Sequence, residues 1–194
     1  MAFHLAQGEL TMRRLALLLC LGLAGCATVT REECLAGDWT AIGTRDGAEG
    51  REASAIFARH QSACARVDVT PDRAAWQTGY DAGLRQFCTP LGGLRAGEAG
   101  RPDRGLCPAS AQRGFQTGYA LGFSAHRQRA RISDIEQEIS TLRARNRQLA
   151  STDPLPREWH LNQSELLSLR LDLTLARTEL ARIEREIRVF RAAQ

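Results

Sequence analysis

Apolar residues near the C-terminus recur at alternating steps of three and four. The first series is Ile132, Ile135, Ile139, Leu142, Asn146 and Leu149. After an interruption at residues 151–157, the second series is Leu166, Leu169, Leu173, Ala176, Leu180, Ile183, Ile187 and Phe190. This alternation is typical of the heptad seam between packed helices. We therefore predict that residues 126–194 form an antiparallel coiled-coil hairpin with its turn near 151–157.

A turn near Pro154 sets the register of this hairpin. The two asparagines that face each other in this register can form a hydrogen bond and fix it. Continued toward the base, the register brings a phenylalanine ring onto a glycine, which would explain why a small residue is needed there. The predicted pairs are Leu149 with Trp159, Asn146 with Asn162, Leu142 with Leu166, Ile139 with Leu169, Ile135 with Leu173, Ile132 with Ala176, Leu121 with Ile187, and Gly118 with Phe190.

Two nearly identical stretches place glycines where a helix favours alanine. They are WQTGYDAGL at residues 76–84 and FQTGYALGF at 115–123, with a looser third copy at Trp39, Gly43 and Gly47. Each interior glycine costs a helix about 1 kcal/mol relative to alanine. Glycines four residues apart form a groove in which a second backbone can approach closely, and the flanking residues here are polar. We therefore predict close-packed Gly-x-x-x-Gly helices in a soluble bundle.

Capping and turn residues divide the segment 34–125 into helices. Thr70-Pro71-Asp72 and Cys107-Pro108 predict two helix starts. The prolines and glycines between Cys88 and Cys107 indicate a loop. The predicted fold class is all-α: a small disulfide-braced helical base over residues 34–125, extended by the hairpin over 126–194.

The N-terminus has the order of charges, apolar residues and small residues found in secretory signal peptides. From Met12 the chain reads MRRLALLLCLGLAGC, ending at Cys26, and its apolar run is too short to span a bilayer. The ending LAGC resembles a bacterial lipobox, which implies cleavage before Cys26 and acylation of this residue. We predict a signal peptide over residues 1–25, with Met12 as the true start, and a lipidated linker over 26–33.

The residue after Cys26 indicates the destination of the lipoprotein. Position 27 is alanine and not aspartate, which by the same resemblance points to the periplasmic face of the outer membrane. Several acyl chains make a durable anchor, and no other apolar run of the sequence is long enough to cross a membrane. We expect a chain that is anchored to the membrane and does not span it; ordinary secretion is the alternative.

Four cysteines remain once Cys20 leaves with the signal peptide and Cys26 carries lipid. An even number of cysteines in an oxidising compartment predicts two disulfides, for which three pairings exist. A metal site with His60 is the alternative, but none of these cysteines has a close Cys-x-x-Cys neighbour, so we expect no metal and no other cofactor. Each favoured pair joins the start and the end of neighbouring predicted helices. The favoured pairs are Cys34–Cys64 and Cys88–Cys107.

Charge adds little to this picture. The sequence has 26 basic residues, all of them arginine, and 22 acidic residues. Removal of residues 1–25 takes away Arg13, Arg14 and Glu9, which leaves a net charge of +3. A net charge this small, in this compartment, does not indicate binding of nucleic acid.

The cysteines, glycines and aromatic residues of the base combine into one pattern. It consists of Cys34, the dipeptides DW, IG and DG of residues 38–47, Gly50, Phe57, His60, Cys64, GYDAGL, Cys88, Cys107 and FQTGYALG. Over roughly residues 26–125 this pattern resembles a family of bacterial lipoproteins defined as domain of unknown function 2799. The resemblance implies the location and the fold, and it brings no known active site.

The sequence does not predict an enzyme. It has no nucleophile motif, metal spacing or phosphate loop, so we expect no catalytic residues. His60, close to an apolar phenylalanine, fits a core or capping residue better than a catalytic one. Its interpretation would change if it lay beside Asp38, Asp46 or Asp81 in the fold.

Two surface features of the hairpin are candidates for binding. One is an apolar ridge off the seam, suited to a protein partner or a second copy of the chain, formed by Leu167, Leu171 and Leu175. The other is a group of arginines near the tip, suited to anionic envelope polymers, formed by Arg143, Arg145 and Arg147. We therefore predict a structural or adaptor lipoprotein that presents a helical hairpin, and the alternative is a binding module for anionic envelope polymers.

Overall fold

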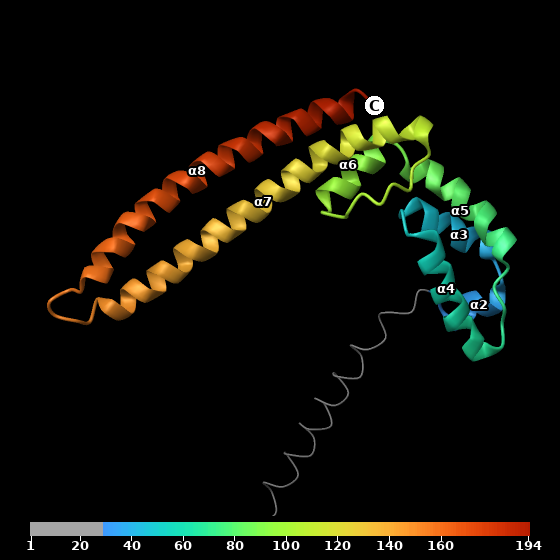
Figure 1. Ribbon diagram of the computed structural model, residues 1–194, viewed down its shortest axis with the longest axis horizontal. Helices are drawn as coiled ribbons and strands as arrows, with labels where there is room; N and C mark the ends of the chain where they lie inside the picture. The colour runs from blue at the N-terminus through green and yellow to red at the C-terminus, as the bar shows by residue number, and fades with distance from the viewer. Residues whose placement is uncertain (1–28) are drawn as a thin grey trace, which may run out of the picture. The chain divides into compact units, whose positions relative to one another are not determined.

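The computed structural model describes residues 29–194, and every regular element in this range is a helix (Figure 1). The predicted signal peptide and Cys26 lie outside the described residues. The chain divides between residues 83 and 84 into two compact units, here called unit 1 (29–83) and unit 2 (84–194). The helices are α2 (Arg31–Ala36), α3 (Trp39–Ala48), α4 (Ala53–Cys64), the 3₁₀ turn η1 (Ala65–Val67), α5 (Arg73–Phe87), α6 (Pro90–Glu98), α7 (Ala109–Leu149) and α8 (Arg157–Ala192).

The helices of unit 1 begin at residues whose side chains cap the free backbone N–H groups. Thr30 and Glu33 form a reciprocal capping box at the start of α2, and Asp38 caps α3. At the start of α5, the Asp72 carboxylate accepts hydrogen bonds from two backbone N–H groups. The helix start predicted near Thr70 is therefore confirmed, with Asp72 as the capping residue.

Both disulfides have the favoured pairing. Cys34 on α2 is bonded to Cys64 at the end of α4, with a Cα–Cα distance of 5.5 Å. Cys88, directly after α5, is bonded to Cys107, shortly before α7, with a Cα–Cα distance of 5.4 Å. The first bond therefore links α2 to the end of α4. The second links the residue that follows α5 to the segment that leads into α7, as the predicted helix boundaries require.

Glycines allow the backbones of α3 and α5 to touch in unit 1. A Cβ atom added to Gly43 would lie less than 3.0 Å from the α5 backbone. A Cβ atom added to Gly79 or Gly83 would lie equally close to the α3 backbone. Real Cβ atoms essentially never come this close to another backbone, so the glycines are a condition of this crossing.

The same kind of crossing joins α6 and α7 in unit 2. Gly93 and Gly97 on α6 lie against the α7 backbone, and Gly118 and Gly122 on α7 lie against the α6 backbone. The two helices run side by side in Figure 1. Close packing of Gly-x-x-x-Gly helices is thus confirmed in both units.

Helix α6 corrects the loop that was predicted between Cys88 and Cys107. Thr89 caps this helix, since its hydroxyl accepts a hydrogen bond from the Gly92 N–H at 3.0 Å, and Pro90 occupies the first turn. The prediction was wrong for residues 90–98 because their glycines were interpreted as turn residues. Gly93 and Gly97 serve instead to admit the backbone of α7, and Gly92 lies against the backbone carbonyl of Phe87.

The partner predicted for Gly118 is also corrected. A Cβ atom added to Gly118 would collide with the backbone of Pro90 and Leu94 on α6, so this glycine does not seat the ring of Phe190. Phe190 packs instead with the cluster that contains Leu94 and Ile187. The register prediction failed at this level because α6, which was not expected as a helix, covers the glycine face of α7.

Units 1 and 2 each contain one version of the same motif, which is the glycine crossing. In each, a tyrosine next to the glycine crossing donates a hydrogen bond to a backbone carbonyl: Tyr80 to Arg51 at 2.6 Å, and Tyr119 to Arg101 at 2.9 Å. The glycine before each arginine has a positive φ. Burial raises the pKa of Tyr80, which keeps its hydroxyl protonated as a donor. The repeated stretches in the sequence therefore correspond to a repeated three-dimensional arrangement.

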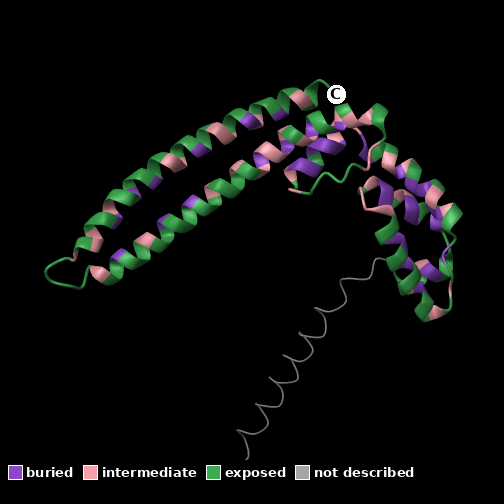
Figure 2. Cartoon of the chain, in the orientation of Figure 1, coloured by how far each residue is buried: buried purple, intermediate pink, exposed green. Residues whose placement is uncertain are grey.

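Helices α7 and α8 form the predicted antiparallel hairpin. The turn between them covers residues 150–156. Asn162 Nδ2 donates to Asn146 Oδ1 at 2.8 Å, which confirms this predicted pair. Figure 2 shows buried positions recurring along both helices between exposed ones. One cluster along the seam contains Ile132, Ile135, Ile139, Leu142, Leu166, Leu169, Leu173 and Ala176.

Helix α7 is continuous across the boundary expected between residues 125 and 126. Its 41 residues correspond to roughly 60 Å at 1.5 Å per residue. The first part of the helix belongs to the glycine crossing and the rest to the hairpin. The compact units separate at residue 83 and not at the junction of base and hairpin.

Candidate functional site

A buried polar cluster lies in the core of unit 1. Asp46 comes from α3, His60 from α4 and Trp76 from α5, and all three side chains are fully buried. Asp46 Oδ2 lies 2.6 Å from His60 Nε2 and accepts a hydrogen bond from Trp76 Nε1 at 2.9 Å. The other carboxylate oxygen is 3.5 Å from the Arg51 guanidinium. Three helices are thus joined at a single carboxylate.

The contact between Asp46 and His60 is one of the arrangements that would favour a catalytic interpretation of His60. A catalytic acid or base must come within hydrogen-bonding reach of its substrate. Neither side chain is accessible, and the carboxylate is held by a tryptophan and an arginine as well. Unit 2 has Ala96 and Phe115 at the positions of Asp46 and Trp76, and both are buried there. The motif therefore folds in unit 2 with apolar residues at these positions.

The predicted leucine ridge lies on the exposed face of α8. Leu167, Leu171 and Leu175 have 65%, 62% and 59% of their surface exposed. They follow one another at intervals of four residues, so they line one face of the helix. The neighbours at three-residue spacing are four small exposed residues, Ser164, Ser168, Thr174 and Thr178, together with the charged residues Arg170 and Asp172.

The three arginines predicted at the tip do not act as one group. Arg145 forms an ion pair with Glu158 at 2.5 Å, and this hydrogen bond lowers the pKa of the Glu158 carboxyl. Arg143 and Arg147 have no carboxylate within 4.0 Å among residues 29–194, and both line a pocket between α7 and α8. The structure thus separates Arg145 from the other two.

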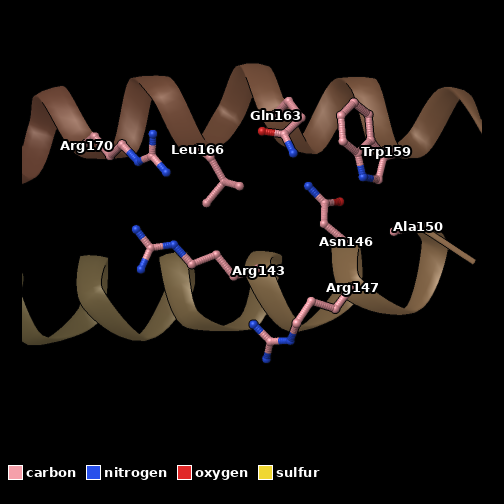
Figure 3. Close-up of a pocket in the computed structure, with 8 residues that line it drawn as sticks. All are labelled: Arg143, Asn146, Arg147, Ala150, Trp159, Gln163, Leu166 and Arg170. Atoms are coloured by element: carbon pink, nitrogen blue, oxygen red, sulfur yellow. The ribbon is translucent and has the colours of Figure 1, made fainter. Parts of the chain in front are cut away.

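The pocket at the hairpin tip has a volume of about 330 Å³ and is drawn in Figure 3. Arg143 and Arg170 extend into it from opposite helices. Asn146, Gln163 and Trp159 point into the space beside them. All of these groups carry N–H donors, and no acidic side chain lines the pocket.

Sequence reasoning found only part of this pocket. It singled out Arg143 and Arg147 by their charge, and Asn146 only as a register residue. Trp159 and Arg170 lie on the other helix, so they join the site only through the hairpin register. The predicted pairing of Leu149 with Trp159 was a signal that could have located this aromatic ring next to the arginines.

Within residues 29–194, no three side chains of metal-binding type come together. None of the helices described in this range is long and apolar enough to cross a membrane. The buried cluster, the leucine ridge and the pocket are three candidate sites of the described chain.

Comparison with known proteins gives one match to a family model, over part of the chain, and no activity. Residues 38–124 match the model of a family described as Protein of unknown function (DUF2799). The match begins at the N-cap of α3 and ends within α7, so it includes both glycine crossings and both disulfides except Cys34. No curated protein and no solved structure matches the chain.

Proposed function

Given that residues 38–124 match the model of this family, we propose that the chain is a lipoprotein anchored by Cys26 to the periplasmic face of the outer membrane. It acts as a structural or adaptor protein and not as an enzyme. It presents the α7–α8 hairpin to a protein partner or to a second copy of itself. The observation that carries this proposal is the exposed leucine ridge of α8.

The ridge has the spacing that helix packing uses. Residues four apart form the ridges that fit into grooves of a neighbouring helix. Full burial of a leucine side chain contributes about 1.5–3 kcal/mol, so three exposed leucines represent a substantial driving force for association. The flanking serines and threonines are small, which allows a second helix to approach the ridge closely. A second copy carries the same ridge and can pair with it symmetrically.

A photo-crosslinking amino acid at position 171, in the envelope of the native host, tests this proposal. We expect an adduct at this position and none at position 165, where an exposed glutamate lies outside the ridge. A self-adduct would assign the ridge to a homo-oligomer, and one reproducible foreign protein would make the chain an adaptor. Absence of any adduct at position 171 would contradict the proposal.

Lipidation is tested by the Cys26→Ser variant. The parent chain is expected to carry acyl groups on an N-terminal cysteine and to sediment with the outer membrane, because several chains anchor durably. The variant is expected to lose both properties, since serine offers no thiol for the thioether. Mass spectrometry of the N-terminal peptide and membrane fractionation measure this. A parent chain with an unmodified N-terminus would point to ordinary secretion.

A second candidate function is binding of anionic envelope polymers. The observation that favours it is the pocket at the hairpin tip, to which Arg143, Arg147 and Arg170 contribute without a carboxylate partner. Charged groups in this position would attract polyanions in a salt-dependent manner. Retention on purified envelope polymer that salt abolishes is the expected result.

A further inference from the structure

The pocket between α7 and α8 offers positive charge that no protein group neutralises. Arg143, Arg147 and Arg170 have no carboxylate within 4.0 Å in the described chain, whereas Arg145 and Arg177, on the same two helices, pair with glutamates. Guanidinium groups bind carboxylates and phosphates through paired N–H donors. The pocket is therefore suited to an anionic group.

Asn146 supplies an independent indication of a ligand. Its side chain is only 6% exposed, and its Oδ1 is occupied by the amide of Asn162 at 2.8 Å. This bond leaves the Asn146 amide nitrogen, which is itself buried at the wall of the pocket, without a hydrogen-bond partner. A buried N–H group without an acceptor is unfavourable. An acceptor oxygen on a bound molecule would satisfy it.

Trp159 and Leu166 give the pocket an apolar side. Both residues line the pocket, and Leu166 is buried. Sugar rings combine a flat C–H face with acceptor hydroxyls, which matches an aromatic ring next to several N–H donors. The volume of about 330 Å³ is at the lower end of ligand pockets and suits one or two rings.

From these three features we infer that the pocket binds a sugar ring that carries a phosphate or carboxylate group. Arg143 and Arg170 bind the anionic group, Asn146 donates to a ring substituent, and Trp159 stacks on the ring. This inference rests on the second candidate function and names the ligand class for it. Phosphorylated and carboxylated sugars are both components of bacterial envelopes, and the probes below distinguish them.

Calorimetric titration of the full chain, purified in a non-ionic detergent, tests the inference with four probes. Glucose phosphate and glucuronate carry the ring and a charge, glucose carries the ring alone, and inorganic phosphate carries the charge alone. We expect one or both charged sugars to bind at least about ten-fold more tightly than glucose and inorganic phosphate. The tighter of the two charged sugars identifies the preferred anionic group. Failure of both to bind would overturn the inference.

Variants of residues that line the pocket separate a specific site from a general effect of charge. Arg143→Gln/Arg170→Gln is expected to weaken binding of the charged sugar by at least about ten-fold, and Trp159→Leu to remove the advantage over inorganic phosphate. Arg145→Gln is the matched control, since it removes an arginine from the same turns of α7 but does not line the pocket. Equal losses in the control and the double variant would overturn the inference.

The polymer experiment distinguishes the failure of this inference from that of the second candidate function. Salt-sensitive retention on envelope polymer without binding of the charged sugars would leave the polymer function standing and remove the pocket from it. Loss of both polymer retention and sugar binding would overturn both the polymer function and the inference about the pocket.

Discussion

Gly118→Ala is expected to lower the free energy of unfolding of unit 2 by roughly 2–4 kcal/mol. The added methyl group would lie less than 3.0 Å from the backbone of Pro90 and Leu94, and a backbone cannot rotate away as a flexible side chain can. The crossing of α6 and α7 would therefore have to open. Opening it would expose Leu94, which is almost fully buried. Hydrogen exchange of the α6 and α7 amides in the full chain measures the effect.

Gly114→Ala, one turn earlier on α7, is the matched control. Its Cβ would meet only the ring of Pro90, at 3.2 Å, so a small adjustment suffices. Alanine favours a helix over glycine by about 1 kcal/mol, which offsets this adjustment. We expect a change within about 1 kcal/mol of the parent chain. Equal losses in the two variants would mean that the glycines do not act through the backbone crossing.

Asp46→Ala is expected to lower the free energy of unfolding of unit 1 by roughly 3–5 kcal/mol. The substitution removes the acceptor of both His60 and Trp76 Nε1 and leaves these groups buried without a partner. The Arg51 guanidinium also loses its nearest charge in the core. Hydrogen exchange of the α3 and α5 amides reports this change separately from unit 2.

The arrangement in unit 2 suggests how to restore this stability. Asp46→Ala/His60→Leu/Trp76→Phe replaces the whole cluster with apolar side chains, two of them as found at Ala96 and Phe115. Replacing a buried polar network by apolar groups is often far less costly than breaking it. The combined variant is therefore expected to be more stable than Asp46→Ala. If it were less stable, the cluster would have to stabilise unit 1 through more than its mutual hydrogen bonds.

The hairpin was predictable because its period is visible in the sequence. Steps of three and four identify the seam, and the asparagine pair fixes the register near the tip. The disulfides followed from the helix boundaries, since each cysteine lies close to a helix end. These features depend on local patterns or on simple antiparallel geometry.

Helix α6 was not predictable in the same way. The sequence PLGGLRAGE has three glycines and a proline, and its local preferences favour a turn. It is helical because packing against α7 stabilises it, and that packing requires the glycines. The partner of Gly118 was then misassigned as a consequence. The local preference and the tertiary requirement act in opposite directions at these residues.

The candidate sites depend on distant residues and were predicted only in part. The Asp46–His60–Trp76 cluster joins three helices, and no spacing in the sequence indicates that these residues meet. The pocket joins α7 and α8 near the turn, so its arginines stood out by charge while Trp159 did not. Residues that act across helices can be assigned only when the helix pairing is known to within one turn.

The return of α8 to α6 affects the order in which the chain can fold during synthesis. The described part of unit 1 ends at residue 83. In unit 2, Leu94 and Ala125 share a cluster with Ile183 and Ile187, and Arg191 pairs with Glu98. A chain that stops before residue 183 would leave this cluster uncovered, and one that stops before residue 166 would leave the seam uncovered as well. Unit 2 therefore cannot complete its core until translation has reached almost the last turns of α8.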